Sequence, residues 1–335
     1  MGATSEMGPS SAAQLVARWK DQLAGRGLTV ALADGADERC VTAALRLHED
    51  GVVAPLLLGE RQEIRNTARR VGRLIPDEIV LDLPDAVRRS DVQATLEGVF
   101  STHPQRLPAV LGDATFLAAA LLCRGEVDAV VAGATRPTAD VLRAGLRVVG
   151  LADGVTTLSS SFLLIFPDGR RMTFADCAVV PDPDVVTLAD IATSAARTHR
   201  QLTGEQTAIA MLSFSTRGSA SHPRVDIVRA ATKLVRARQP ELPVDGELQF
   251  DAAIVASVAV KKAAGSAVAG RANVLVFPNL DAGNIGYKIA ERLGGAVALG
   301  PILQGLAAPL NDLSRGCSSS DIEIMALLSA AQSLD

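Results

Sequence analysis

The residue types with the widest range of chemistry lie near the C-terminus, in segments 300–305 and 309–321. Ser314 offers a hydroxyl, Arg315 a permanent cation with five N–H donors, and Asp321 a carboxylate. Gly316 lies between them and lets the backbone come close to a ligand. Together these groups can bind an anion and move a proton.

Two of these side chains have more than one interpretation. Ser314 as a nucleophile needs a base within reach, and no histidine is close in the sequence. A hydrogen bond from Ser314 to a developing oxyanion, beside Arg315, makes fewer demands on the site. Asp321 lies near an arginine and at a predicted helix start, where it can act as a base or simply cap the helix.

A second candidate segment, 133–143, joins the end of a predicted strand to the start of a helix. The N–H groups of a helix start, together with the hydroxyls of Thr135 and Thr138, would point at one place, as in many phosphate sites. Arg143 lies one turn into this helix and would add positive charge. A capped helix with a surface arginine explains the same pattern.

Two further loops lie at the ends of predicted strands. Segment 213–219 includes Ser215 among several hydroxyls and is either an anion-binding loop or an ordinary turn. Segment 281–292 contains Asn284, and its Lys288 and Arg292 are four residues apart, so they share one helix face. That face points either at an anion or at solvent. The same pattern in three loops favours an anionic ligand.

Several common sites have no support in the sequence. No G-x-G-x-x-G follows a predicted strand and no G-x-x-x-x-G-K-[ST] occurs, which argues against dinucleotide and nucleoside-triphosphate binding. The four histidines are not paired and no cysteine or carboxylate cluster has zinc spacing, so we expect no metal. The chain has 33 basic and 37 acidic side chains and no basic run with aromatics, which argues against a nucleic-acid partner.

The rest of the chain alternates between strand and helix patterns, as in proteins with helices packed on parallel sheets. Its hydrophobic fraction is 48% and its aromatic fraction 3%, so small aliphatic side chains provide the packing. We expect strands at 28–32, 54–58, 79–81, 128–132, 158–166, 171–174, 208–214 and 272–277. We expect helices at 13–23, 38–48, 62–73, 91–100, 114–123, 139–149, 185–200, 225–238, 252–262, 284–293 and 321–332.

At 335 residues the chain is longer than one typical core supports. A Pro-Asp-Gly turn at 167–169 predicts an antiparallel hairpin, and this change of pattern indicates a domain boundary near residue 150. The final helix has no predicted strand of its own and is expected to cover the first sheet. The prediction is two α/β/α domains with largely parallel sheets, formed by 1–150 plus 301–335 and by 151–300. Segment 300–321 would then cross the cleft between them, where α/β proteins bind ligands.

Nothing in the sequence indicates a membrane or a secretory route. The longest apolar stretches are strand-sized, the N-terminus lacks a secretion signal, and Glu6 stands where myristoylation requires Ser or Thr. The four cysteines are scattered without a CxxC, which favours reduced thiols. We expect a soluble cytoplasmic protein with no membrane partner and a frayed terminus at 1–12.

Several long motifs carry a resemblance to one family. Segment 273–288 (NVLVFPNLDAGNIGYK), then GPILQG at 300–305 and NDLSRGC at 311–317, resembles the C-terminal signature of the phosphate acetyltransferases. Segments 133–143, 174–177, 211–216 and 245–248 resemble the same family in the same order. Because the motifs keep their spacing over nearly the whole chain, it is identified as a member of that family.

The resemblance implies reversible transfer of an acetyl group between coenzyme A and inorganic phosphate, by direct thiolate attack in a ternary complex with no bound cofactor. It implies an isocitrate dehydrogenase-like fold, an active site in the interdomain cleft, and a homodimer. Asp321 would be the base for the coenzyme A thiol, Ser314 would stabilise the tetrahedral transition state, and Arg315 would bind the phosphate or acyl oxygen. The further arginines expected around the site are Arg39, Arg143 and Arg292.

One stretch departs from the family pattern. Ser101 stands where the family usually has an arginine, so either Arg106 supplies this contact to coenzyme A or the affinity is weaker, and His103 gains interest. Three rival interpretations stay open. They are a phosphate propionyl- or butyryltransferase, a metal- and NAD(P)-dependent decarboxylating dehydrogenase of the same fold, and a catalytically silent relative.

Overall fold

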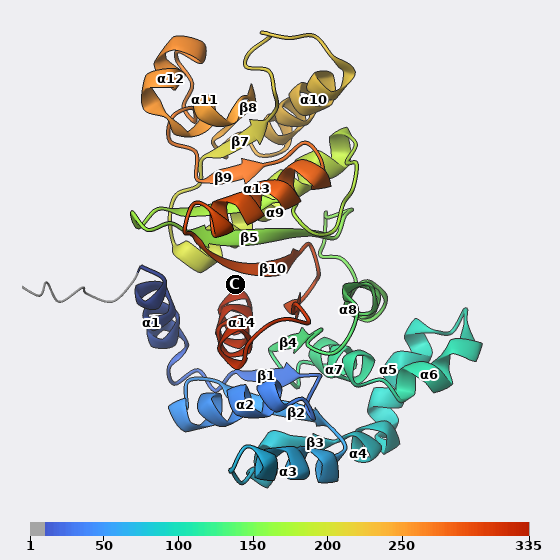
Figure 1. Cartoon of the computed structure of the whole chain (residues 1–335). Helices are drawn as coiled ribbons and strands as arrows, with labels where there is room; N and C mark the ends of the chain where they lie inside the picture. The colour runs from blue at the N-terminus through green and yellow to red at the C-terminus, as the bar shows by residue number, and fades with distance from the viewer. Residues whose placement is uncertain (1–10, 335) are drawn as a thin grey trace, which may run out of the picture.

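The computed structural model describes residues 11–334, so most of the terminus predicted to fray lies outside the described residues. Two β-sheets, each covered by helices, follow one another along the long axis of the molecule (Figure 1). Helix α14 (Ser319–Gln332) lies between the sheets and contacts strands of both.

The first sheet is parallel throughout, with the strand order β11-β4-β1-β2-β3. Its strands are short runs of mostly buried residues: β1 (Thr29–Leu32), β2 (Ala54–Gly59), β3 (Val80–Asp82), β4 (Ala129–Ala132) and β11 (Leu310–Asp312). One core includes α1 (Ser11–Leu23), α2 (Glu38–Asp50), α3 (Arg61–Arg70) and α14. The other includes α5 (Ser90–Val99), α7 (Ala114–Cys123) and α8 (Thr138–Ala144).

The second sheet has the order β10-β5-β6-β9-β7-β8, with antiparallel pairing only at the β10-β5-β6 side. Its strands are β5 (Ser159–Ile165), β6 (Arg171–Ala175), β7 (Ile209–Leu212), β8 (Val244–Leu248), β9 (Val274–Val276) and β10 (Val297–Gln304). Its cores include residues of α9 (Val185–Thr203) and α10 (Pro223–Arg238), and of α11 (Phe250–Ile254) and α13 (Leu280–Arg292).

Most of the predicted elements are confirmed, including the hairpin of β5 and β6. The single helix expected over 252–262 is wrong, because extended backbone at Val255 separates α11 from α12 (Ala256–Lys262). The last helix does have a strand before it, β11, which three residues were too few to reveal. Strand β10 was missed because Gly300-Pro301 interrupts it, which an edge strand tolerates.

The chain passes between the sheets twice, and Leu151 pairs with Leu306 where the two passages meet. Strand β10 continues to Gln304, so it runs across the domain boundary predicted at 301, and the boundaries themselves stay a prediction. No single helix among residues 11–334 is long and apolar enough to cross a membrane. The helical stretches 104–111 and 114–123 reach that length only together and are bent by 100°.

Parallel pairing brings the carboxyl ends of β1, β4 and β11 to one edge of the first sheet. The loops that follow these strands therefore meet there, although they are far apart in the sequence. They contain Asp34, Thr135 and Ser314.

Candidate active site

The predicted catalytic stretch borders a cavity of about 280 Å³. One wall comes from β5, β10 and α13, and the other from α14 and the loop before it. Ser314, Asp321 and Arg292, all predicted site residues, line this cavity. Its apolar lining includes Phe162, Tyr287, Leu299, Pro301, Ile324 and Met325.

Asp321 caps α14 and still presents a carboxylate to the cavity. Its Oδ2 accepts hydrogen bonds from the backbone N–H and the hydroxyl of Ser318, at 2.8 and 2.9 Å, and Ser318 in turn caps the Asp321 N–H at 3.2 Å. This reciprocal arrangement is a capping box. Only Oδ2 is used in it, so the cap and the base interpretations of Asp321 are compatible.

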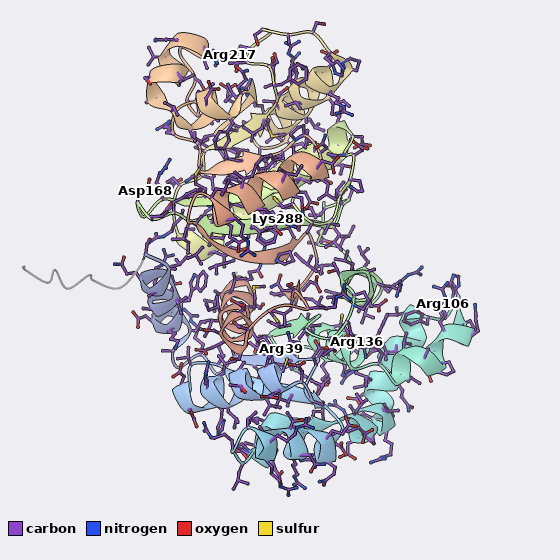
Figure 2. All side chains as sticks on the ribbon, viewed as in Figure 1. Arg39, Arg106, Arg136, Asp168, Arg217 and Lys288 are labelled. Atoms are coloured by element: carbon purple, nitrogen blue, oxygen red, sulfur yellow. The ribbon has the colours of Figure 1, made fainter. Side chains whose placement is uncertain are left out.

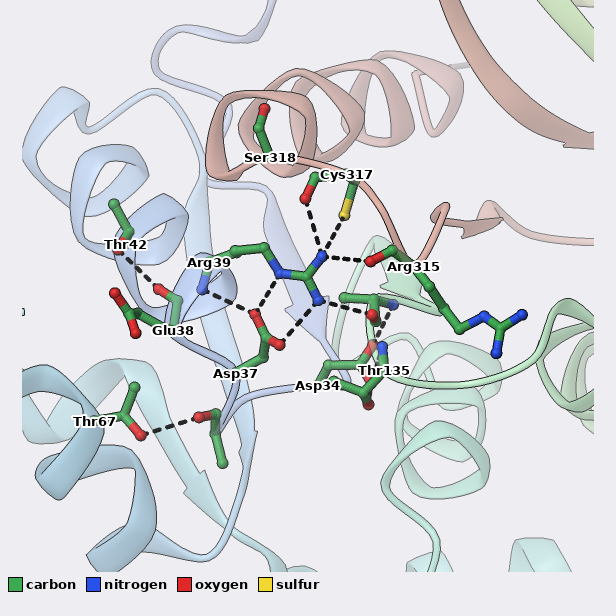
Figure 3. Close-up of polar contacts among 12 residues, drawn as sticks. Asp34, Asp37, Glu38, Arg39, Thr42, Thr67, Thr135, Arg315, Cys317 and Ser318 are labelled. Carbon is green, nitrogen blue, oxygen red and sulfur yellow. Dashed lines mark hydrogen bonds and ion pairs between the residues drawn. The ribbon is translucent and has the colours of Figure 1, made fainter.

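Ser314 and Arg315 lie on the exposed surface of the loop between β11 and α14. The Ser314 hydroxyl accepts a hydrogen bond from the Gly316 N–H at 3.2 Å, and the Cys317 N–H donates to the Ser314 carbonyl at 2.9 Å, which closes a tight turn. The Arg315 guanidinium extends away from the cluster around Arg39 (Figure 3). It has no acidic partner among the described residues, so its donors are available to a ligand.

Arg39, at the start of α2, is held entirely by the protein (Figure 3). It forms a two-pronged ion pair with Asp37, the N-cap of α2, and donates to the backbone carbonyls of Ala134, Arg315 and Cys317. The hydrogen bond from Arg39 lowers the pKa of the Asp37 carboxyl, and the same bond raises the pKa of Arg39.

The loop after β4 binds an anion, but that anion is the protein's own Asp34. The N–H groups of Gly133, Ala134 and Thr135 donate to the Asp34 carboxylate at 2.9, 3.0 and 3.3 Å, and the Thr135 hydroxyl donates to it as well. The Thr138 hydroxyl donates to Asp312 at 2.6 Å. The donors that the sequence assigned to phosphate are therefore occupied inside the protein.

Asp312, the last residue of β11, is a buried acid that sequence reasoning missed. It is 1% exposed, and its Oδ1 has no hydrogen-bond partner among the described residues. Burial raises its pKa to about 6; the hydroxyl of Thr138 acts against this shift, and the negative charge of Asp34 adds to it. Asp34 could have been found from its position just after the predicted first strand, at the carboxyl end of a parallel sheet, whereas the three-residue strand β11 gave no such signal for Asp312.

The other predicted ligands lie outside the cavity. Arg143 pairs with Asp140 at 2.6 Å on exposed surface, and the Asn284 amide donates to the Cys177 carbonyl at 3.0 Å. The Ser215 hydroxyl is fully buried and donates to the Glu247 carboxylate at 2.8 Å, so this loop binds an anion of the protein itself, and a contact from Ser215 to substrate stays a prediction.

The remaining cations are spread over the two sheets. Lys288 lies above the Tyr287 ring, at 5.9 Å from its centre, on the second sheet's side of the molecule. Figure 2 shows Arg106 at the outer end of the α5–α6 region, far from Arg39 and Lys288 (α6 is Leu107–Leu111). Ser101 is exposed and His103 half-buried in the same region. Whether Arg106 contacts coenzyme A stays a prediction.

A larger cavity, of about 780 Å³, lies between α9 and the two passages that join the sheets. None of the predicted site residues lines it, so the smaller cavity, which contains the reactive groups, is the candidate active site. Within residues 11–334 no group of three or more His, Cys, Asp or Glu side chains is placed to hold a metal ion.

Comparisons with known proteins agree with the geometry. Residues 14–330 match the family described as phosphate acetyl/butaryl transferase. A phosphate acetyltransferase from Thermoanaerobacterium thermosaccharolyticum is 42% identical over 312 residues, which cover 90% of this chain and 94% of that protein.

Solved structures give the same result. A phosphotransacetylase from Streptococcus pyogenes is 39% identical and superposes with a TM-score of 0.90 over 96% of this chain and 98% of that one. A 4-hydroxythreonine-4-phosphate dehydrogenase from Klebsiella pneumoniae, 15% identical, has a TM-score of 0.55 over 91% of this chain and all of that one, a likeness of fold alone. The predicted α/β fold with largely parallel sheets, isocitrate dehydrogenase-like, is confirmed. The chain belongs to the phosphate acetyl/butaryl transferase family.

Proposed function

We propose that this protein is a phosphate acetyltransferase, which transfers an acetyl group reversibly between acetyl-CoA and inorganic phosphate. The observation that carries the proposal is that Ser314, Asp321 and Arg292 line one cavity in a chain of this family. A carboxylate, a hydroxyl and a guanidinium are the groups that acyl transfer between a thiol and a phosphate requires.

In the direction of acetyl-CoA synthesis, Asp321 takes the proton of the coenzyme A thiol. The thiolate attacks the carbonyl carbon of acetyl phosphate, and a tetrahedral intermediate forms. The Ser314 hydroxyl donates to the carbonyl oxygen as that oxygen becomes negative. The bond from carbon to the phosphate oxygen then breaks, and phosphate leaves.

Arginines supply the positive charge that this reaction needs. Arg292 lines the cavity with an exposed side chain, and Arg315 has free donors on the neighbouring loop. A guanidinium presents two parallel N–H donors, which match two oxygens of a phosphate. Local charge of this kind attracts anionic substrates although the whole chain has a net charge of −4.

The direct test is release of free thiol from acetyl-CoA on addition of phosphate, in the presence of EDTA and without a nicotinamide cofactor. We expect thiol release in proportion to the acetyl phosphate formed. A requirement for NAD(P) and a divalent metal would instead favour the dehydrogenase. An absence of turnover at any phosphate concentration would favour a catalytically silent relative. Independence from cofactor and metal stays a prediction until this assay is made.

The preferred acyl group needs its own comparison. Rates with acetyl-, propionyl- and butyryl-CoA, each with phosphate, are expected to fall as the chain lengthens. A higher kcat/KM with propionyl- or butyryl-CoA would change the assignment to a longer-chain phosphate acyltransferase.

A homodimer is also part of the proposal. Ile285, Ile289 and Leu293 recur every four residues along α13 and its end, with 58%, 53% and 84% of their surface exposed. An exposed apolar stripe of this kind is typical of a protein interface. Sedimentation velocity is expected to give twice the monomer mass; a monomer at micromolar concentration would contradict this. A cytoplasmic location stays a prediction from the cysteine pattern.

A further inference from the structure

Every N–H donor of the Arg39 guanidinium has an acceptor within the protein. The guanidinium carries five N–H groups, and the structure supplies an acceptor for each (Figure 3). Nε donates to Oδ1 of Asp37 at 2.9 Å, and Nη2 donates to Oδ2 of Asp37 at 3.0 Å and to the carbonyl of Ala134 at 2.8 Å. Nη1 donates to the carbonyls of Arg315 and Cys317 at 2.8 and 2.9 Å.

The carbonyls held by Arg39 belong to segments that are remote in the sequence. Ala134 follows β4 and lies 95 positions from Arg39, whereas Arg315 and Cys317 lie 276 and 278 positions away, between β11 and α14. The second of these segments carries the Ser314 hydroxyl. One side chain therefore links the start of α2 to the backbone on both sides of Gly316.

Asp37 fixes the direction in which the guanidinium points. Its carboxylate is 17% exposed, caps the first turn of α2 through the Arg39 N–H at 2.9 Å, and grips Nε and Nη2 at the same time. A carboxylate that is itself anchored by a helix start leaves the fork little freedom to rotate. The guanidinium of Arg39 is therefore held in place by Asp37 before substrate binds.

We propose that Arg39 is a positioning residue for acetyl transfer, which fixes the backbone that carries Ser314 and Arg315 and does not bind substrate. The inference rests on the proposed function. The family resemblance placed Arg39 among the arginines around the substrates, but a phosphate oxygen could be bound only if one of the five internal hydrogen bonds were given up.

The first test is Arg39→Lys. An ammonium is a compact charge without a planar fork, so it does not grip Asp37 at two points while holding three carbonyls. We expect kcat for phosphate-dependent thiol release to fall about 10²-fold, as for other small displacements of reacting groups. KM for acetyl-CoA and for phosphate should stay within about twofold, because no substrate contact is removed.

Arg46→Lys is the matched control. Arg46 lies on the same helix, its side chain is half exposed, and its nearest acid, Glu323, is 3.9 Å away. Its replacement should leave kcat and KM unchanged. An Arg39→Lys enzyme with wild-type kcat and a tenfold higher KM for either substrate would overturn the inference, and so would one with no change in either constant.

One further measurement separates this inference from the proposed function. Hydrogen exchange at the backbone amides of 315–318 should be faster in Arg39→Lys than in the wild type and unchanged in Arg46→Lys; this readout needs no turnover. If the wild type lacks phosphate-dependent activity, the proposed function fails on its own, and the exchange result still decides whether Arg39 orders the loop.

If Arg39→Lys does not fold, Asp37→Asn is used instead. We expect kcat to fall about tenfold and KM to stay unchanged. An unchanged kcat would overturn the inference.

Discussion

The loops after β4 and β11 look alike in the sequence but point their polar groups in opposite directions. Each follows a strand of the first sheet and combines a hydroxyl with an arginine. In the first loop the hydroxyl of Thr135 donates to buried Asp34. In the second the side chains of Ser314 and Arg315 stay exposed, and Arg39 donates to the backbone carbonyls of Arg315 and Cys317.

This difference separates stability from chemistry. The loop after β4, here called the inward loop, donates hydrogen bonds to buried acids such as Asp34. Removal of such a donor leaves a buried carboxylate without a partner. In the outward loop, which follows β11, the exposed Ser314 hydroxyl accepts one hydrogen bond, from the Gly316 N–H, and the Arg315 guanidinium has no acidic partner among the described residues, so both are available to a substrate. Substitutions in the outward loop should therefore change turnover, and substitutions in the inward loop should change the free energy of unfolding.

The largest effect is expected for Asp321→Asn, beside the outward loop. Asparagine still caps α14 but does not take a proton from a thiol, so kcat should fall about 10³-fold, the middle of the range for general bases. Calorimetry should show that coenzyme A still binds. Glu323→Gln, on the same helix, is the control, and near-wild-type turnover of Asp321→Asn would exclude Asp321 as the base.

Ser314→Ala should lower kcat about 10²-fold, as for loss of one donor to an oxyanion. The melting temperature should not change, because this side chain is exposed and only accepts a hydrogen bond from Gly316. Ser320→Ala, also exposed, should keep full activity. Wild-type turnover of Ser314→Ala would show that the outward loop supplies no transition-state contact from this hydroxyl.

Asp312→Asn is expected to act on stability in a pH-dependent way. The pKa of Asp312 is raised to about 6 in the folded protein from an ordinary value of 3.8, so the folded state binds the proton more tightly than the unfolded state. Wild-type stability should therefore fall as the pH rises from 4 to above 6, by up to ~3 kcal/mol at one pKa unit per ~1.4 kcal/mol.

Asparagine does not ionise, so Asp312→Asn lacks this loss. The free energy of unfolding is measured with urea at pH 4.5 and at pH 7.5. The value for the variant minus the value for the wild type should be ~2 kcal/mol larger at pH 7.5 than at pH 4.5. The change between the two pH values isolates the ionisation from any difference in hydrogen bonding. Equal differences at both values would show that Asp312 does not titrate in this range.

The smallest effect is expected for Thr135→Val. Loss of a hydroxyl that donates to the buried Asp34 carboxylate should lower the free energy of unfolding by ~1–2 kcal/mol. Both kcat and KM should stay within about twofold of wild type. Thr102→Val, at an exposed threonine, is the control for stability. A fall in kcat comparable to that of Ser314→Ala would mean that the inward loop also contacts substrate.

The sequence by itself predicted most of the elements and named candidate reactive groups. Strand and helix patterns depend on neighbouring residues, so β1, α2, α7 and the hairpin could be predicted locally. The motif at 311–317 and Asp321 were identified from residue types alone. What local patterns did not contain was the pairing of β11 with β4, 180 positions earlier at Leu310 and Val130.

Only the tertiary structure decided which polar groups form hydrogen bonds within the protein and which stay available to a substrate. Thr135, Ser215 and Arg39 have the residue types of a substrate site, yet each is held by an acid or a carbonyl that the fold brings to it. Ser314 has the same residue type as Ser215 and stays exposed. A hydrogen bond depends on distance and direction in space, and spacing along the chain fixes neither for residues on different elements.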